Sequence, residues 1–285
     1  MAFRTLLPFT LAALTAALAP TPAFAQFQAP LPSPTSTITQ RIGLTELAVS
    51  YSRPSVKGRA VWGELVPWDK PWRTGANQAT TLIVSDEITV EGQKLLGGTY
   101  SIVTIPGKKE WTVIFNRDLK LWTGTTEYDP AKDVLRVKVK PVAIPLVETL
   151  RIGFNTVGAA SGVLAIEWEK VQVPLTIGVD IDAKVHRIVA AAGPADWQTP
   201  MNAARYYFEQ KRNQAEAWTW LEKSIAIQRN FVNLTRKARV LADEDKVAEA
   251  VKVGEEALAL AKAAPEKPNA STLEKSLAEW KAKLK

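Results

Sequence analysis

The spacing of hydrophobic and polar residues changes once along the chain, and the first pattern is typical of β-strands. Between residues 38 and 178, short runs rich in β-branched and aromatic residues are separated by turn-forming residues. Val137 and Val139 point to one face, whereas Arg136, Lys138 and Lys140 point to the other. This alternation predicts strands of an antiparallel sheet with one solvated face. The predicted strands include 80–85, 99–105, 111–115, 134–140, 147–154 and 163–169.

The order of these runs predicts a sandwich-like or barrel-like β-domain. Residues 106–109, with the sequence Pro-Gly-Lys-Lys, predict a hairpin turn between two runs. No helical pattern intervenes between 38 and 178, which argues against a parallel α/β sheet.

Beyond Ile177 the apolar spacing becomes helical. A connecting helix is predicted within 179–198, with Asp180 or Asp182 as its N-cap and Gly193-Pro194 as its end. The region 199–285 then repeats with an offset of 33 residues, close to the period of about 34 of tetratricopeptide helix pairs. The positions that repeat are Phe208, Ala217, Leu221 and Ile225, matched by Leu241, Ala250, Gly254 and Leu258. The predicted fold class is therefore α+β: an antiparallel β-sandwich-like domain followed by a short tetratricopeptide-like helical region.

The last predicted helix begins near Ser271. This residue is expected to be the N-cap, with Glu274 completing a capping box.

The first 25 residues have the layout of a secretory signal peptide. Arg4 is followed by an apolar stretch, and Ala23-Phe24-Ala25 is a small-x-small cleavage motif. We therefore expect the mature chain to begin at Gln26 and to be periplasmic or secreted. Residues 26–37 contain several prolines and predict a flexible leader.

Composition narrows the possible functions. The chain has 285 residues, no cysteine, one histidine and a formal net charge of +7. Disulfides are excluded, and a zinc site lacks its usual ligands, so we expect neither metal nor cofactor. The basic residues are spread without a Lys/Arg-rich run, which argues against nucleic-acid binding. After residue 25 no apolar run reaches the length of about 18 residues that a transmembrane helix requires.

Residues 51–81 are the main candidate for a binding site, because they combine aromatic and guanidinium groups in a long loop. One interpretation is that the loop holds a small anionic or carbohydrate ligand, since arginine binds carboxylates and phosphates and tryptophan stacks on sugar rings. The other is structural: Arg73 bonds to loop carbonyls and the tryptophans close the open end of the β-domain. The candidate ligand-binding residues are Arg53, Trp62, Trp68, Trp72, Arg73, Thr74 and Asn77.

Catalytic patterns are weak by comparison. The single His186 lies outside the dense loop, and no G-x-S-x-G motif or phosphate-binding loop occurs. Glu64 and Asp69 are the candidates for the paired carboxylates of a carbohydrate-active enzyme. No catalytic residue is therefore assigned, and the enzyme stays an alternative.

The dense motifs resemble a known family. Ser52-Arg53-Pro54, 72–77 (Trp-Arg-Thr-Gly-Ala-Asn), 98–101 (Gly-Thr-Tyr-Ser) and 111–116 (Trp-Thr-Val-Ile-Phe-Asn) are similar to those of the secreted bacterial family called domain of unknown function 2911. The resemblance covers about residues 40–173. It implies an exported β-domain, often followed by helical repeats, and supplies no catalytic residues. Gln78 stands where many relatives are expected to have glutamate.

These observations predict an exported, non-catalytic module of the bacterial envelope that binds a ligand or a partner. The helical region is expected either to dock a protein partner or to pack against the β-domain. The carbohydrate-active enzyme is one alternative, and a purely structural envelope protein is the other.

Overall fold

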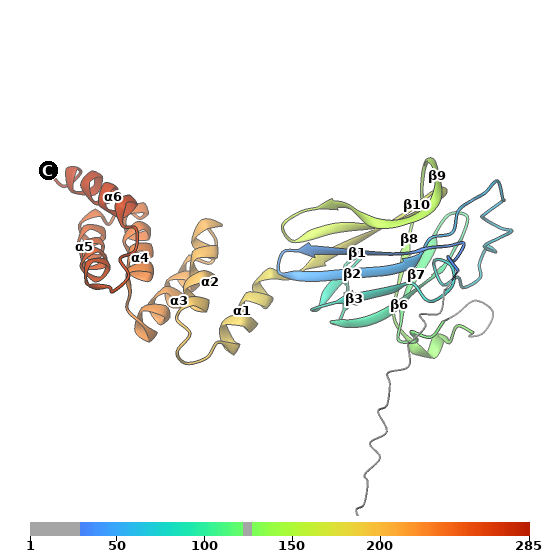
Figure 1. Cartoon of the computed structure of the whole chain (residues 1–285), viewed down its shortest axis with the longest axis horizontal. Coiled ribbons are helices and arrows are strands. Elements are labelled where there is room, and N and C mark those ends of the chain that lie inside the picture. The colour runs from blue at the N-terminus through green and yellow to red at the C-terminus, as the bar shows by residue number, and fades with distance from the viewer. Residues whose placement is uncertain (1–28, 122–126) are drawn as a thin grey trace, which may run out of the picture.

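The computed structural model describes residues 29–121 and 127–285, in which ten strands are followed by six α-helices (Figure 1). The α+β class is therefore confirmed. The predicted signal peptide, residues 1–25, lies outside the described residues. Within the two described ranges, none of the helices combines the length and hydropathy required to cross a lipid bilayer.

The strands form two antiparallel sheets. The six-stranded sheet contains, in spatial order, β1 Thr35–Ile42, β2 Thr45–Ser52, β3 Thr81–Val84, β6 Gly98–Ile105, β7 Trp111–Asn116 and β8 Asp133–Val139. The four-stranded sheet contains β5 Gln93–Leu95, β4 Ile88–Val90, β10 Ser161–Val179 and β9 Val142–Val157. The strands within 80–169 and the β6–β7 hairpin thus follow the alternation of the sequence.

The first strand begins earlier than predicted. Thr35 pairs with Ser52 in the register of β1 with β2, so residues 35–37 of the predicted leader belong to the sheet. The predicted leader ends too late, at residue 37, because threonine and serine occur in both loops and edge strands. A short 3-10 turn, Pro130–Lys132, precedes β8.

One continuous apolar core lies between the sheets. Leu47 and Val49 of β2 are fully buried, while the residues between and beside them are less so. Trp111 contributes from the six-stranded sheet and Trp168 from the four-stranded sheet. Each such side chain stabilises the fold by about 1.5–3 kcal/mol relative to its exposed state. The two sheets therefore form a sandwich-like domain.

Six helices extend from the end of the sandwich at which β10 finishes (Figure 1). They are α1 Ile181–Ala191, α2 Gln198–Glu209, α3 Gln214–Ile227, α4 Phe231–Asp243, α5 Val247–Ala263 and α6 Ser271–Ala282. Their core is separate from that of the sheets. Ala217 and Ala250, which match in the sequence repeat, are both fully buried. The tetratricopeptide character of these helices stays a prediction.

The helix caps agree with the sequence in one case and differ in another. Asp180 caps α1, because its Oδ1 accepts a hydrogen bond of 2.9 Å from the Ala183 backbone N–H. The expected capping box at Ser271 is wrong. Ser271 is the first residue of α6, and Asn269 Oδ1 accepts its backbone N–H at 3.0 Å. Asn269 competes for this role because its amide side chain forms the same local bond.

Helix α1 joins the two regions. Lys184 Nζ donates to Oδ1 and Oδ2 of Asp86, in the turn after β3, at 2.6 and 2.5 Å. On the helical side, the Tyr207 hydroxyl of α2 donates to Asp182 Oδ1 at 2.9 Å. The β1–β2 turn also lies under α1, because a Cβ added to Gly43 would be only 2.9 Å from Ile181 Cγ1.

Candidate functional site

The candidate loop, residues 53–80, is held to both sheets by its backbone; we call it the cap loop. Val56 N–H donates to Glu148 O at 2.8 Å, and Leu150 N–H donates to Pro54 O at 2.9 Å, so its start pairs with β9. Further along, Trp72 and Thr104 of β6 exchange backbone hydrogen bonds of 2.7 and 2.8 Å. The cap loop is therefore an ordered bridge between the two sheets.

The arginines of the cap loop donate to backbone carbonyls. Arg53 Nε donates to Leu150 O at 2.9 Å, and Arg73 Nε donates to Asn77 O at 3.0 Å. Arg59 Nε and Nη2 donate to Val56 O at 3.0 Å and Ser55 O at 2.5 Å. Burial lowers the pKa of the Arg73 guanidinium. These bonds are the ones that the structural interpretation of the loop predicts.

Two neighbouring polar residues fix the turn that follows Arg73. Thr74 is fully buried, and its hydroxyl donates to Thr104 Oγ1 at 3.1 Å. Asn77 Nδ2 donates to Ser33 O at 2.9 Å and to Ser52 Oγ at 3.3 Å. Thr74 and Asn77 both have positive φ, at 60° and 54°. Their side-chain bonds offset the cost of this backbone conformation.

The tryptophans of the cap loop pack against the end of the core. The Trp62 ring lies 4.9 Å from that of Trp111 and 5.7 Å from that of Trp168, edge to face in both cases. Trp72 stacks on Trp168 at 5.7 Å, and Trp68 lies 6.4 Å from Trp62. Because Trp111 and Trp168 belong to opposite sheets, the cluster closes the sandwich between them. Ligand contact by the seven predicted residues stays a prediction.

The two carboxylates proposed for catalysis, Glu64 and Asp69, are both exposed. Asp69 is held by its backbone, whose N–H donates to Pro106 O at 2.8 Å. In the described part of the chain, no three His, Cys, Asp or Glu side chains gather in a group able to hold a metal ion.

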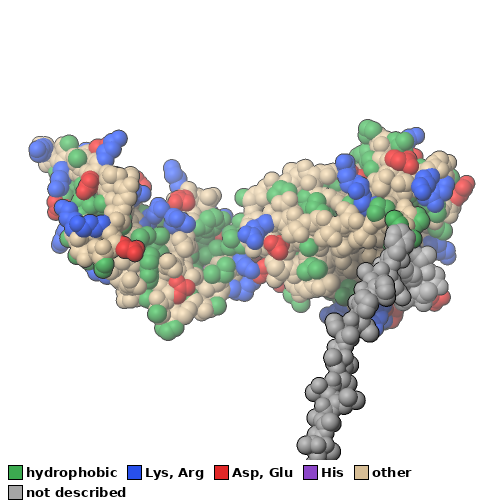
Figure 2. Space-filling model, in the orientation of Figure 1, with side chains coloured by type: hydrophobic (Ala, Val, Ile, Leu, Met, Phe, Trp, Pro, Cys, Tyr) green, Lys and Arg blue, Asp and Glu red, His purple; other side chains and the backbone are tan. Residues whose placement is uncertain are grey.

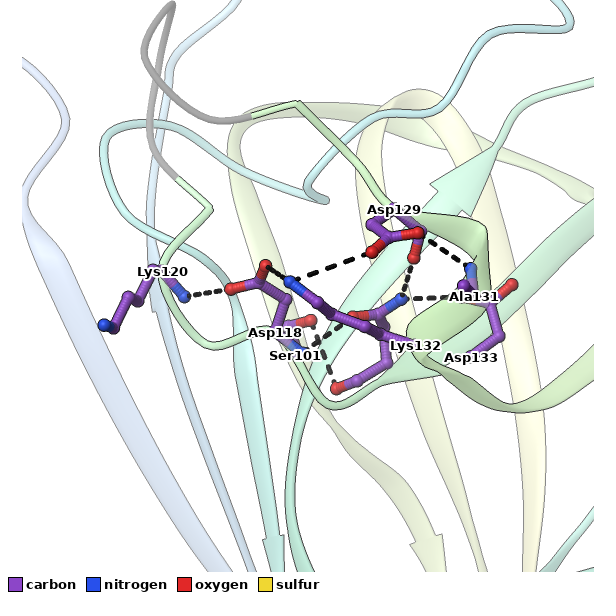
Figure 3. Close-up of polar contacts among 8 residues, drawn as sticks. Ser101, Asp118, Lys120, Asp129, Ala131, Lys132 and Asp133 are labelled. Carbon is purple, nitrogen blue, oxygen red and sulfur yellow. Dashed lines mark hydrogen bonds and ion pairs between the residues drawn. The ribbon is translucent and has the colours of Figure 1, made fainter.

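A polar cluster at the β7–β8 connection is not predicted from the sequence (Figure 3). Asn116 is fully buried, and its Nδ2 donates to Asp129 O at 2.9 Å and to Asp133 Oδ1 at 2.7 Å. Lys132 Nζ donates to Asp118 Oδ2 at 2.7 Å and thereby lowers the pKa of Asp118. Each of these groups is already hydrogen-bonded to protein, so the cluster holds the connection together.

A family comparison covers the β-domain. Residues 33–177, half of the chain, match the profile described as Protein of unknown function (DUF2911). The chain belongs to the DUF2911 family. No curated protein and no solved structure matches it. The matched range contains the cap loop and ends just before α1, so the DUF2911 domain is the sandwich and the helices lie outside it.

A pocket of about 540 Å³ lies where the DUF2911 domain meets the helices; we call it the junction pocket. Hydrophobic side chains gather at this junction on the surface (Figure 2). The DUF2911 domain supplies its β1–β2 and β9–β10 turns, and α1 and α2 supply the rest. The pocket is lined by Gly43, Leu44, Ala159, Ile181, Val185, Ile188, Val189, Thr199, Asn202, Ala203, Tyr206 and Gln210.

The sequence prediction missed the junction pocket for a topological reason. The β1–β2 turn is more than a hundred residues away in the chain from the β9–β10 turn, α1 and α2, and local spacing does not show that these elements meet. A signal was nevertheless present in α1. Ile181, Val185, Ile188 and Val189 form one apolar stripe, yet Ile188 is 42 % exposed and Leu44 opposite it is 44 % exposed.

Proposed function

We propose that this DUF2911 protein is a non-catalytic binding protein of the bacterial envelope, and that a small, mainly apolar molecule binds in the junction pocket. The observation that carries the proposal is the pocket itself. Its volume of about 540 Å³ lies within the range of about 300–1,000 Å³ that is typical of small-molecule sites.

The chemistry of the walls indicates the class of ligand. The α1 wall is aliphatic, with Val185, Ile188 and Val189. The α2 wall contributes hydrogen-bonding groups, among them Asn202 and Gln210. A molecule with an aliphatic body and one hydroxyl or carbonyl end matches this division, because buried polar groups require partners and aliphatic walls do not supply them.

The same walls support binding rather than catalysis. None of the lining residues carries a carboxylate, imidazole, ammonium or guanidinium group. General acid–base catalysis most often uses such a group within hydrogen-bond distance of the substrate, and the Tyr206 phenol is the one ionisable side chain among the lining residues. The ion pair between Asp86 and Lys184 holds α1 against the sandwich, which favours a pocket that is formed before the ligand arrives.

The cap loop fits this function as a structural element. Its arginine Nε groups bond to carbonyls and its tryptophans close the sandwich at a place distinct from the residues that line the junction pocket. A role of the cap loop in holding an anion or a sugar is the second candidate, carried by the part-exposed Trp62, Trp68 and Trp72.

Location in the envelope rests on the signal-like sequence of residues 1–25. Expression of the full-length chain in a Gram-negative host and mass spectrometry of the periplasmic fraction test this part. We expect a chain that begins at Gln26. Recovery of the uncleaved chain from the cytoplasm would contradict it.

A thermal-shift screen tests the ligand class. A ligand that binds only the native state stabilises it by about 2.7 kcal/mol at one hundred times its Kd. Dodecanol is expected to raise the Tm of the mature protein, while glucose and inorganic phosphate, which represent the ligand classes considered for the cap loop, leave it unchanged. A shift with glucose or phosphate alone would favour the cap loop instead.

A further inference from the structure

Three arginines gather on neighbouring helices, and none of them lines the junction pocket. Arg236 and Arg239 are three residues apart on α4 and share one face of the helix, and Arg205 lies on α2, which packs against α4. Arg236 is largely covered, since only 21 % of its side chain is exposed, whereas Arg205 is exposed.

The charge of this cluster is not balanced. One carboxylate, Glu209, pairs with Arg236 at 3.2 Å. Across residues 29–121 and 127–285, no salt bridge involves Arg205 or Arg239. Nearby basic residues do have partners: Arg229, just before α4, pairs with Glu256, and Lys237 of α4 pairs with Glu222.

Repulsion within the cluster acts on the pKa of Arg236. Burial lowers the pKa of its guanidinium, Glu209 partly restores it, and the charges of Arg239 and Arg205 lower it further. Like charges held together at a partly covered position are unfavourable unless an anion is present. An anionic partner would therefore be stabilised here by more than an isolated surface arginine provides.

Two further features of α4 lie beside the arginines. The hydroxyl oxygen of Thr235 is buried and has no hydrogen-bond partner among the described residues. Val232 is 46 % exposed, and the spacing Val232, Arg236, Arg239 places an apolar group and two cations along one stripe of the helix. We call Arg205, Val232, Thr235, Arg236 and Arg239 the arginine face.

We infer that the arginine face binds an acidic segment of a partner protein, with aspartate or glutamate side chains on the guanidinium groups and an apolar side chain on Val232. The planar fork of arginine matches a carboxylate with two parallel hydrogen bonds. A peptide side chain can reach the covered guanidinium of Arg236, whereas a flat membrane surface contacts exposed groups only. The net excess of positive charge supplies the complementarity that steers such a partner.

Fluorescence anisotropy with the full mature protein tests this inference. The probe is a fluorescein-labelled peptide of alternating glutamate and leucine, and its comparison is the same peptide with glutamine for glutamate. The double variant Arg205→Gln/Arg239→Gln is expected to bind the glutamate peptide about tenfold more weakly or worse. Neither arginine makes a salt bridge with any residue that the structure describes, so this variant is expected to fold normally, with a Tm at or slightly above that of the parent.

A matched control changes the net charge equally at another surface. Lys252→Gln/Lys275→Gln removes two exposed cations from α5 and α6 and is expected to leave the affinity unchanged. Equal weakening by both double variants would overturn the inference, because it would indicate a general charge effect. Binding of the glutamine peptide as tight as that of the glutamate peptide would also overturn it. A third outcome would overturn the inference as well: the glutamate peptide does not bind, whereas phosphatidylglycerol vesicles or inorganic phosphate bind in a way that depends on Arg205 and Arg239.

Discussion

Asp86 and Lys184 form the ion pair that joins the DUF2911 domain to α1, with Lys184 Nζ 2.5 Å from Asp86 Oδ2. Both side chains are largely covered, at 12 % and 23 % exposure respectively. Arg187 lies 3.5 Å from the same carboxylate. An ion pair in such a position fixes geometry, because each charge is poorly solvated without the other. This pair therefore holds the two walls of the junction pocket in register.

Asp86→Asn is expected to lower the free energy of unfolding by about 1–3 kcal/mol, between the values typical of exposed and of buried ion pairs. Urea denaturation followed by tryptophan fluorescence measures the change. Glu46→Gln is the control, since Glu46 and Arg41 form a pair with side chains 54 % and 69 % exposed, and we expect about 0–1 kcal/mol there. Equal losses in the two variants would show that the junction pair has no special role.

The stability that Asp86 provides should decrease as the pH falls. Burial alone would raise the pKa of Asp86, but the hydrogen bonds from Lys184 and Ser85 and the charges of Lys184 and Arg187 hold it below its ordinary value of 3.8. A lowered pKa in the native state contributes stability above the unfolded value, and this is lost as the pH falls through the native value. The difference in the free energy of unfolding between the parent and Asp86→Asn is therefore greatest at pH 7 and shrinks below about pH 4. If this free-energy difference stays constant as the pH falls below 4, the lowered pKa of Asp86 is not its cause.

Alanine substitutions at two glycines of the cap loop should destabilise the protein to different extents. A Cβ added to Gly63, whose φ is +94°, would lie 2.6 Å from Trp68 Nε1, whereas a Cβ at Gly58, whose φ is +68°, would meet nothing within 4 Å. Gly58→Ala is expected to cost about 1 kcal/mol from backbone strain alone. Gly63→Ala is expected to cost about 1–3 kcal/mol more, because Trp68 must move within the tryptophan cluster. Denaturant unfolding and the near-ultraviolet circular dichroism of the tryptophans report both effects, and identical behaviour of the two variants would count against a packed cap loop.

Two tyrosines, Tyr128 and Tyr207, should ionise at a higher pH than an ordinary tyrosine. Burial, with a further contribution from Asp133, raises the pKa of Tyr128 to about 12, and burial with the hydrogen bond to Asp182 raises that of Tyr207 to about 12. A pKa raised in the native state gives stability that is present below the unfolded value near 10 and is lost as the pH rises through about 12. At pH 11 the tyrosinate absorbance should therefore show two fewer ionised tyrosines in the native protein than in the unfolded protein. Tyr128→Phe should remove one of them; a variant that titrates like the parent would contradict this account.

The fold was predictable wherever one face of an element is buried. The alternation of Val137 and Val139 with charged residues places β8 correctly, and Asp180 marks the start of α1. Thr35 and Asn269 were harder, because their polar side chains are compatible with more than one local structure.

The sites were predictable only in part. The composition of residues 51–81 indicated an ordered aromatic loop, and the packing of Trp62 against Trp111 and Trp168 agrees with its structural interpretation. The junction pocket and the arginine face depend on how distant elements meet. Leu44 and Ile188 are more than a hundred residues apart, and no local spacing brings them together.

The binding of 8-anilinonaphthalene-1-sulfonate to the chain from Gln26 to Lys285 tests the central claim most directly, because the fluorescence of this dye reports an apolar pocket. The parent is expected to bind it saturably, and dodecanol is expected to displace it. Ile188→Glu, at the rim of the junction pocket, should weaken binding about tenfold or more. Leu146→Glu, at a residue of β9 that is 58 % exposed and does not line the pocket, should leave binding unchanged. Equal binding by the parent and both variants, or no saturable binding by the parent, would contradict the account.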